Sequence, residues 1–334
     1  MDDVKNVIQW QNDLRSTLHV SIGSSPSIEI KEELLEVIRL QAPEKLAWQL
    51  FDHCAAVTRI YALFEQAICE LVKEYLVFLS CITPEYQNLQ ECTRIQYRIG
   101  VANILSKWKS SKSLYSNITE DAIAAGLADG LRKKPYVLLA EAFLVDTDNY
   151  RTDTINRLFN RFGFSNAFAW VSHSVSIKEF CNRNLGTETA ESYLNNFVQV
   201  RNEAAHGSTT SISSAGEILN YAEFSLLVIT ELASLLRYKI VKTGKSIGRT
   251  EILGDVLHVW AGNVVGVSSS SITTISSGDM LYAGDKRLEL VTVVNLKVGK
   301  TDHDCIKLTP KFEFGAKLDK KIKVGSRLYR WIGP

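Results

Sequence analysis

The residue types best suited to chemistry stand together in one short run, Arg201-Asn202-Glu203-Ala204-Ala205-His206-Gly207. Histidine titrates near neutral pH, so His206 can give or take a proton at a reacting oxygen. Arginine keeps its charge and offers a planar fork of donors that matches phosphate oxygens, which makes Arg201 a candidate phosphate clamp. A fixed cation and a proton carrier are two of the groups that cleavage of a phosphodiester without a metal requires.

The same two side chains also have a purely structural interpretation. The run ends an amphipathic pattern, and Gly207 is typical of a helix terminus. Positive side chains in the last turn are favoured by the helix dipole and by the free carbonyls there. Residues five apart lie about 140° apart on an ideal helix, so Arg201 and His206 do not share one face. Spacing alone therefore leaves both interpretations open.

Helical periodicity extends from the N-terminus to about Tyr238. Apolar residues over 57–79 recur at three- and four-residue steps and predict a long amphipathic helix. Further helices are predicted over 93–108, 118–131, 152–162, 176–184, 187–205 and 214–238. We expect residues 1–50 to form an N-terminal helical extension and residues 51–241 to form an all-α domain.

The pattern changes after a polar linker at 242–250. Short β-branched and aromatic runs, separated by Gly, Asp and Ser, predict strands. These strands are 256–260, 263–267, 280–282, 288–296, 305–308 and 328–332. So many short strands favour a small barrel, because closure removes exposed edges. We therefore predict an α+β fold in two domains, an all-α helical bundle followed by a small all-β barrel-like domain at 251–334.

The run at 198–207 resembles the signature of the HEPN superfamily, an Arg, a polar residue, a short spacer and a His. More narrowly, it resembles the RiboL-PSP-type HEPN group, in which the run typically reads Arg-Asn-Glu-x-Ala-His-Gly. Two upstream blocks stand in the same order as in that group: Tyr61-Ala62-Leu63-Phe64-Glu65-Gln66, and Asn156-Arg157-Leu158-Phe159 followed by Arg161-Phe162-Gly163. The resemblance covers about residues 55–236.

This resemblance implies a metal-independent endoribonuclease without a cofactor, acting as a toxin or phage-defence effector and cutting RNA by attack of the ribose 2′-OH. It implies a homodimer through the helical domain, in which two motifs supply two histidines and two arginines to one cleft. The catalytic residues would be Arg201, Asn202 and His206, with Asn202 orienting the phosphate or a histidine. Glu65 lies in an apolar stripe, where a carboxylate needs a partner. It is either a supporting residue for Arg201 or part of a structural ion pair.

Two considerations limit this interpretation. HEPN toxins silenced by a nucleotidyltransferase antitoxin carry a Tyr three residues after the His, where this chain has Thr209. We therefore expect no modification of that kind here. The alternative function is a catalytically silent HEPN module that binds RNA or a nucleotide, or serves as a scaffold, and the sequence leaves this alternative open.

Composition and charge are those of a globular protein. Hydrophobic residues make up 46% of the chain and charged residues 22%, which argues against wholesale disorder. The formal net charge is +1, so global electrostatics give no reason to expect a protein that coats nucleic acid. From Lys286 onward, however, there are twelve Lys/Arg and five Asp/Glu. We expect this basic part of the β domain, particularly 317–323, to contact RNA or a protein partner, with a solvated strand face as the alternative.

Cysteine and histidine usage predicts no metal site and no disulfide framework. Six scattered cysteines, no signal peptide and no long apolar segment favour a reduced, soluble, cytoplasmic protein without membrane contact. There is no Cys-x-x-Cys, and His53 and the other histidines lack metal-ligand spacing, so they are interpreted as core or surface residues. Gly244-Lys245-Ser246 imitates the end of a P-loop, but Lys239 stands where that motif needs Gly.

Overall fold

The structure is a computed structural model that describes residues 5, 8–9, 11–12, 44–107, 118–132, 135–145, 147, 149–186, 188–209 and 211–332. Contacts between Cα atoms divide the chain into two compact units. The first unit comprises Met1–Val72 and Phe143–Glu231, and the second comprises Lys73–Ala142 and Leu232–Pro334. Most of the predicted N-terminal extension at 1–50 lies outside the described residues.

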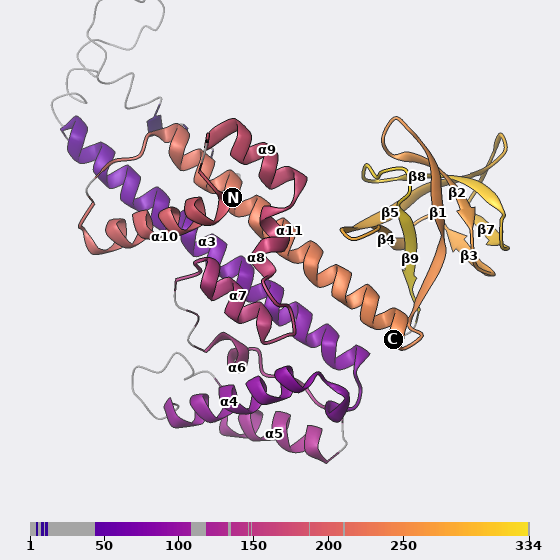
Figure 1. Ribbon diagram of the computed structural model, residues 1–334, viewed down its shortest axis with the longest axis horizontal. Helices are drawn as coiled ribbons and strands as arrows, with labels where there is room; N and C mark the ends of the chain where they lie inside the picture. Colours follow the sequence, from indigo (N-terminus) through magenta and orange to yellow (C-terminus); the bar gives the residue numbers. More distant parts are fainter. Residues whose placement is uncertain are drawn as a thin grey trace, which may run out of the picture. The chain divides into compact units, whose positions relative to one another are not determined.

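Among the described residues before 247, all regular secondary structure is helical, as predicted, and Figure 1 shows α3 and α11 as the two longest helices. The helices are α3 (Lys45–Ile82), α4 (Glu91–Lys107), α5 (Glu120–Leu131), α6 (Glu141–Leu144), α7 (Thr152–Asn160), α8 (Ala167–Ser172), α9 (Val175–Asn184), α10 (Ala190–His206) and α11 (Ala215–Ser246), with a short 3-10 helix, η1 (Tyr86–Asn88). Each helix predicted from periodicity is present. The short helices α6 and α8 were not predicted, because neither is long enough to establish a period.

Helix α11 extends further than expected, since residues 242–246, predicted as the start of a linker, are helical. Gly244 remains inside this helix because no side chain fits there. A Cβ at Gly244 would lie 2.2 Å from Thr250 Oγ1 and 2.5 Å from the Trp331 ring. Gly244, within the stretch predicted as a polar linker, is therefore a packing residue, and only residues 247–249 separate α11 from the first strand.

Aromatic side chains form the centre of the first unit. Phe197 of α10 lies 5.9 Å from Tyr61 and 6.5 Å from Phe64 of α3, measured between ring centroids. On its other side, the Phe197 ring stacks on Tyr221 of α11 at 4.8 Å. Large buried rings contribute strongly to core stability. These contacts fix α10 between the two long helices.

The β domain is a closed barrel, as predicted (Figure 1). The strands are β1 (Thr250–Trp260), β2 (Val264–Ser269), β3 (Thr273–Ser276), β4 (Met280–Gly284), β5 (Leu288–Val298), β6 (Thr301–His303), β7 (Cys305–Leu308), β8 (Glu313–Leu318) and β9 (Arg327–Trp331). The order β4-β9-β1-β2-β8-β5 closes through pairing of β4 with β5, and β6 adds to the edge of β5. All these pairings are antiparallel.

The observed strands differ from the predicted list at β3, β6, β7 and β8. The predicted strand at 305–308 exists as β7, but it pairs with β3 in a separate two-stranded sheet, although Ile306 and Leu308 share the hydrophobic core of the barrel. Its place is taken by β8, which the sequence analysis missed because this segment has no β-branched residue and has Gly315 and Ala316 at its centre. Strand β3 lies within the Ser/Thr-rich stretch before residue 277, where hydroxyl-bearing residues obscure the alternation.

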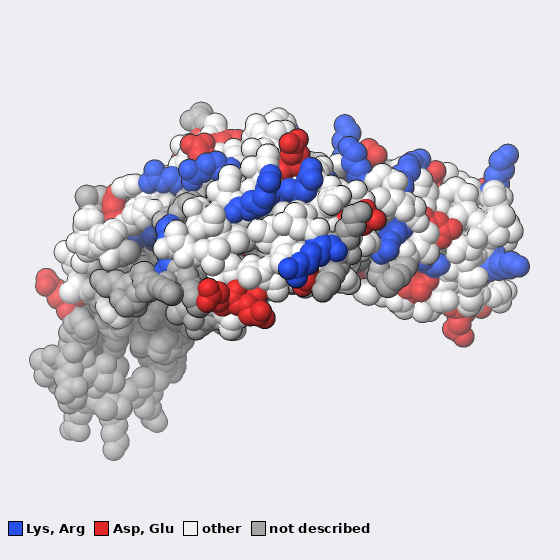
Figure 2. Space-filling model, turned by 90° about the horizontal axis from the view of Figure 1, so that it is seen from below, with Lys and Arg blue, Asp and Glu red and all other residues white. Residues whose placement is uncertain are grey.

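The charged side chains are distributed in keeping with the near-neutral sequence. On the face seen in Figure 2, the described basic and acidic residues form small groups of either sign, separated by uncharged residues. None of the described helices combines the length and the hydropathy needed to span a membrane.

Candidate active site

The helix that carries the Arg-His run has defined ends. At its start, the Thr189 hydroxyl accepts a hydrogen bond from the Ser192 backbone N–H at 3.2 Å. At its end, Gly207 adopts a left-handed conformation, with φ of 68°, and its N–H bonds to the Glu203 carbonyl. The Ser208 N–H reaches the same carbonyl at 3.0 Å. Helix α10 therefore ends at His206, as the sequence predicts.

Arg201 lies on the inner face of α10. The buried stripe of this helix includes Leu194, Phe197 and Ala204. Because Arg201 follows Phe197 by four residues and precedes Ala204 by three, it continues the same stripe. Its side chain is 21% exposed. A guanidinium at such a position needs protein partners to offset its lost hydration.

Three kinds of contact hold the Arg201 guanidinium. It lies over the Tyr61 ring, with its central carbon 3.9 Å from the ring centroid. Its Nη1 donates to Asn149 Oδ1 at 3.2 Å and to Asn202 Oδ1 at 2.8 Å. Its Nη2 lies 3.8 Å from Glu65 Oε2, an ion pair longer than a hydrogen bond. The structure thus brings together three of the four predicted site residues, Arg201, Asn202 and Glu65.

The same contacts leave part of the Arg201 fork available. A guanidinium has five N–H donors, and the two on Nη1 are used by the two asparagines. Within the described part of the chain, the Arg201 Nε and Nη2 donors have no hydrogen-bond acceptor. Because Glu65 is 39% exposed and 3.8 Å away, its attraction for the guanidinium is weakened by solvent. The cation is fixed in position and still has donors for a phosphate.

Asn149 is a site residue that the sequence analysis did not identify. It occupies the left-handed region, with φ of 54°, which asparagine tolerates better than most residues. The next residue, Tyr150, fixes this geometry because its backbone N–H donates to the Tyr61 hydroxyl at 2.7 Å. The Tyr150 side chain is buried, which raises the pKa of its hydroxyl. One tyrosine, Tyr61, therefore supports Arg201 through its ring and the Asn149 loop through its hydroxyl.

His206 stands in a different environment from Arg201. It is the last residue of α10 and is exposed. Among the described residues, nothing hydrogen-bonds to its ring. Five residues of α-helix correspond to about 7.5 Å along the axis and about 140° around it. Within one chain, Asn202 therefore orients the arginine, and His206 is presented to the outside.

The second upstream block of the family resemblance, residues 156–163, makes structural contacts. Asn156 Oδ1 accepts the backbone N–H of Phe168 at 2.9 Å, which joins α7 to the start of α8. The Arg161 Nη1 donates to the carbonyls of Phe143 and Val145, the latter at 3.0 Å. These side chains shape the bundle that positions α10.

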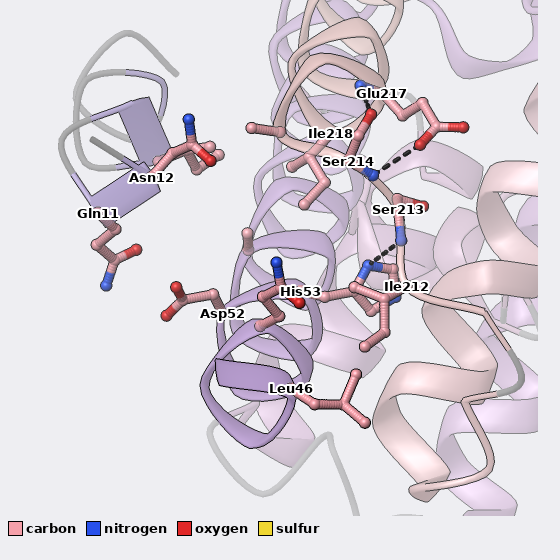
Figure 3. A pocket seen from close by; sticks show the side chains of 14 residues that line it. Gln11, Asn12, Leu46, Asp52, His53, Ile212, Ser213, Ser214, Glu217 and Ile218 are labelled. Carbon is pink, nitrogen blue, oxygen red and sulfur yellow. Dashed lines mark hydrogen bonds between the residues drawn. The ribbon is translucent and has the colours of Figure 1, made fainter. Parts of the chain in front are cut away.

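A polar pocket of about 400 Å³ lies beside the loop that follows the Arg-His run (Figure 3). His53 of α3, 1% exposed, accepts the Ser213 backbone N–H at its Nδ1, at 3.1 Å. Accepting at Nδ1 places the proton of the neutral ring on Nε2. Burial lowers the pKa of His53, against the opposing influence of Glu217 and Glu203. The neutral form of His53 thus holds this loop.

Two further contacts order the same loop. The Ser214 backbone N–H donates to Glu217 Oε2 at 2.6 Å and the Glu217 N–H to Ser214 Oγ at 3.2 Å, a reciprocal capping box that begins α11. Thr209, which replaces the Tyr of antitoxin-modified toxins, has its hydroxyl 3.5 Å from Cys54 Sγ. Nowhere in the described ranges do three or more His, Cys, Asp or Glu gather where they could hold a metal ion.

Comparisons with known proteins give one informative match. A family model described as RiboL-PSP-HEPN matches residues 25–238. A search of curated proteins found no match. Among solved structures, the flavohemoglobin from Malassezia yamatoensis with bound FAD and heme is 14% identical to this chain, with a TM-score of 0.14. That match covers 78% of this chain but only 64% of the other, less than two thirds, and so low a TM-score gives no support for a shared fold. Because the family match spans more than half of the chain and includes all of α10, the chain belongs to the RiboL-PSP-HEPN family.

Proposed function

We propose that this protein is a metal-independent endoribonuclease of the HEPN type. Family membership supports a ribonuclease or a nucleotide-binding module. The observation that carries the narrower proposal is the state of Arg201. Its guanidinium is held over Tyr61 by two asparagines, with donors left for a phosphate, on the helix that ends in the exposed His206.

The reaction fits these two side chains. The ribose 2′-oxygen attacks the adjacent phosphorus while a base takes the 2′ proton, and the bond from phosphorus to the 5′-oxygen breaks. An acid returns a proton to the leaving 5′-oxygen, which gives a 2′,3′-cyclic phosphate and a 5′-hydroxyl. Arg201 would compensate the negative charge on the non-bridging phosphate oxygens. His206 would serve as the base or as the acid.

A homodimer would supply the missing proton carrier. One chain offers one His206, whereas the reaction uses a base and an acid on opposite sides of the phosphorus. Two copies that pair through their helical parts would bring two His206 and two Arg201 side chains to one cleft. We expect a dimer at micromolar concentration by light scattering, and a fully active monomer would contradict this part of the proposal.

The alternative is a HEPN module that binds RNA without cutting it. Glu65 provides the observation in its favour, because a carboxylate 3.8 Å from Arg201 can neutralise the guanidinium in a purely structural ion pair. In that case the cleft would bind RNA and the two His206 side chains would transfer no proton.

Incubation of the purified protein with total RNA in EDTA distinguishes the two. We expect cleavage that leaves cyclic phosphates, and a loss of about two orders of magnitude or more in His206→Ala and in Arg201→Ala. Arg201→Lys should keep partial activity, since it preserves the charge but not the fork. His173, also exposed and on the same unit, gives the matched control His173→Ala, which should cleave normally. Loss of activity on chelation, or undiminished activity in folded His206→Ala, would refute the proposal.

A toxin or phage-defence role follows at the level of the cell. Expression of the wild-type chain should arrest growth, whereas expression of His206→Ala at the same level should not. Arrest by both chains would separate toxicity from the proposed chemistry.

A further inference from the structure

An irregularity in β1 turns two aromatic side chains to the outside of the barrel. The register of β1 against β2 shifts between Val256 and His258, so that Leu257 and His258 are both exposed. Bulges of this kind re-aim side chains and are frequent near functional sites. Beyond the shift, His258 and Trp260 stand on the same outer face, with ring centroids 5.7 Å apart and planes inclined by 36°. Trp260 is 55% exposed.

Two glycines, Gly266 and Gly315, leave the outer surface of the sheet open beside these rings. His258 pairs with Gly266 of β2, Gly266 with Gly315 of β8, and Gly315 with Lys297 of β5. One row across four strands therefore begins with an aromatic ring, crosses two residues without side chains and ends with a lysine. A Cβ at Gly266 would lie 3.1 Å from the Trp260 ring, so the indole rests on the bare strand. The result is a groove of about 520 Å³.

Two lysines, Lys297 and Lys317, line the groove, and Lys321 lies at the β1–β2 turn. In the neighbouring row, Val264 of β2 pairs with Lys317 of β8, which is exposed and has no ion-pair partner among the described residues. Lys297 lies on the opposite wall, 3.4 Å from Asp302. The side chain of Lys321 passes the β1–β2 turn, 3.0 Å from where a Cβ of Gly262 would stand. Glu313 is the one acidic residue among the described residues that line the groove.

We propose that this groove binds an unpaired nucleotide of single-stranded RNA. Its base stacks on the open face of Trp260, and Lys317 and Lys297 contact the neighbouring phosphates. Aromatic platforms flanked by basic side chains are how proteins hold single strands without reading their sequence, because every base has a stacking face. A base in a duplex is covered on both sides and cannot take this position. The choice of RNA as the polyanion rests on the proposed function, in which the barrel and the site at Arg201 act on the same kind of substrate.

Binding is measured with the full chain and a short, mixed-sequence 2′-O-methyl RNA labelled with a fluorophore. This probe lacks the 2′-OH and cannot be cut, so affinity is read without cleavage. Trp260→Ala should weaken binding about tenfold or more, and Trp260→Phe, which keeps a ring, by much less. The same probe annealed to its complement should bind more weakly than the single strand.

Two further variants separate the groove from general charge and from misfolding. A Cβ at Gly315 would meet nothing closer than 3.5 Å, so Gly315→Val should fold and fill the groove, weakening binding as much as Trp260→Ala. Lys317→Gln should weaken binding more than Lys307→Gln, a change of the same charge on the exposed surface of β7, outside the groove. Lys317→Gln should also reduce the salt dependence of binding.

These measurements test RNA binding by the groove and RNA cleavage by the helical part independently of each other. Affinity that is unchanged in both Trp260→Ala and Gly315→Val overturns the groove, as does equal binding of duplex and single strand. If these variants lose binding while the wild-type chain cuts no RNA in EDTA, the groove stands and the ribonuclease proposal fails. If wild-type cleavage depends on His206 but binding ignores the groove, the ribonuclease stands and this inference fails. Capture of a peptide by the groove without RNA binding also refutes the inference.

Discussion

Asn149 offers the sharpest test of how Arg201 is held. The residue does two separable things: it adopts a left-handed backbone with φ of 54°, and its Oδ1 accepts a hydrogen bond from Arg201 Nη1 at 3.2 Å. Asn149→Gly removes only the side-chain acceptor, because glycine tolerates positive φ. Asn149→Ala removes the acceptor and adds backbone strain. Asn149→Asp keeps an acceptor and makes it negative.

The expected changes in the free energy of unfolding follow from these two roles. A hydrogen bond to a charged group contributes about 1.5–3 kcal/mol, and the lower end applies here because the pair is partly exposed to solvent. Both Asn149→Gly and Asn149→Ala should lose this amount. Alanine in the left-handed region adds about 1–2 kcal/mol, against about 0.5–1 kcal/mol of backbone entropy for glycine. Asn149→Ala should therefore be the less stable of the two, and Asn149→Asp at least as stable as the wild type.

Activity should follow a different order. Per folded molecule, Asn149→Gly and Asn149→Ala should cleave equally slowly, about ten- to a hundredfold below the wild type, since both lose the same positioning contact to Arg201. Asn149→Asp should be stable yet slow, because its carboxylate competes with the phosphate for the guanidinium. Urea denaturation and initial cleavage rates measure the two orders. A fully active Asn149→Asp, or an Asn149→Ala far slower per folded molecule than Asn149→Gly, would refute this account of the site.

Two further predictions test the scaffold. Burial lowers the pKa of His53 below its ordinary value of 6.5, so its contribution to the free energy of unfolding should be fully present above pH 6.5 and fall as the pH drops below it. His53→Asn, which keeps an acceptor at the Nδ1 position, should lose this pH dependence in urea titrations. An identical pH dependence in both proteins would contradict the role of His53. Gly100→Ala should lower the free energy of unfolding by about 3 kcal/mol, because its Cβ would lie 1.8 Å from the Ala142 carbonyl oxygen. The control Gly216→Ala, at a helical position with no atom closer than 3.9 Å, should leave the melting temperature unchanged or raise it.

The sequence predicts the parts of this fold that depend on local pattern. The long amphipathic helices and most barrel strands follow from periodicity, because burial of one face imposes the spacing of apolar residues. Pairing between strands is not local. Nothing in residues 305–308 distinguishes a strand that joins the barrel from one that pairs with β3. Strand β8 was not predicted because Gly315 and Ala316 have low strand propensity, and in the structure Gly315 lines a groove.

The candidate site divides in the same way. Arg201, Asn202 and His206 share one helix, so their types and spacing could be read directly from the sequence. Tyr61 stood in a block that resembled the family, but nothing in that block indicated that a guanidinium would lie on its ring. Asn149 is 52 residues from Arg201, and only the folded chain brings the two together. The available signal was asparagine's tolerance of the left-handed region in the polar stretch before α7, which indicates a turn and gives no partner.

The five-residue spacing of the motif has a geometric consequence that can be tested. Arg201 occupies the buried stripe of α10 and cannot leave it without losing Tyr61, whereas His206 stands exposed at the helix end. Since an α-helix turns about 100° per residue, moving the histidine back by one position places it four residues from Arg201, on the same side of the helix. The double variant Ala205→His with His206→Ala keeps the composition, the charge and the helix.

If the histidine needed only to be close to the arginine, this double variant should regain activity lost in His206→Ala. We expect no recovery, because the proposed reaction requires an imidazole directed away from its own Arg201, towards a cleft completed by a second copy. Ala205 is exposed, so the new side chain causes no clash and folding should be retained. Cleavage by the double variant at the wild-type rate would show that one chain assembles the whole site, and the dimeric mechanism would have to be abandoned.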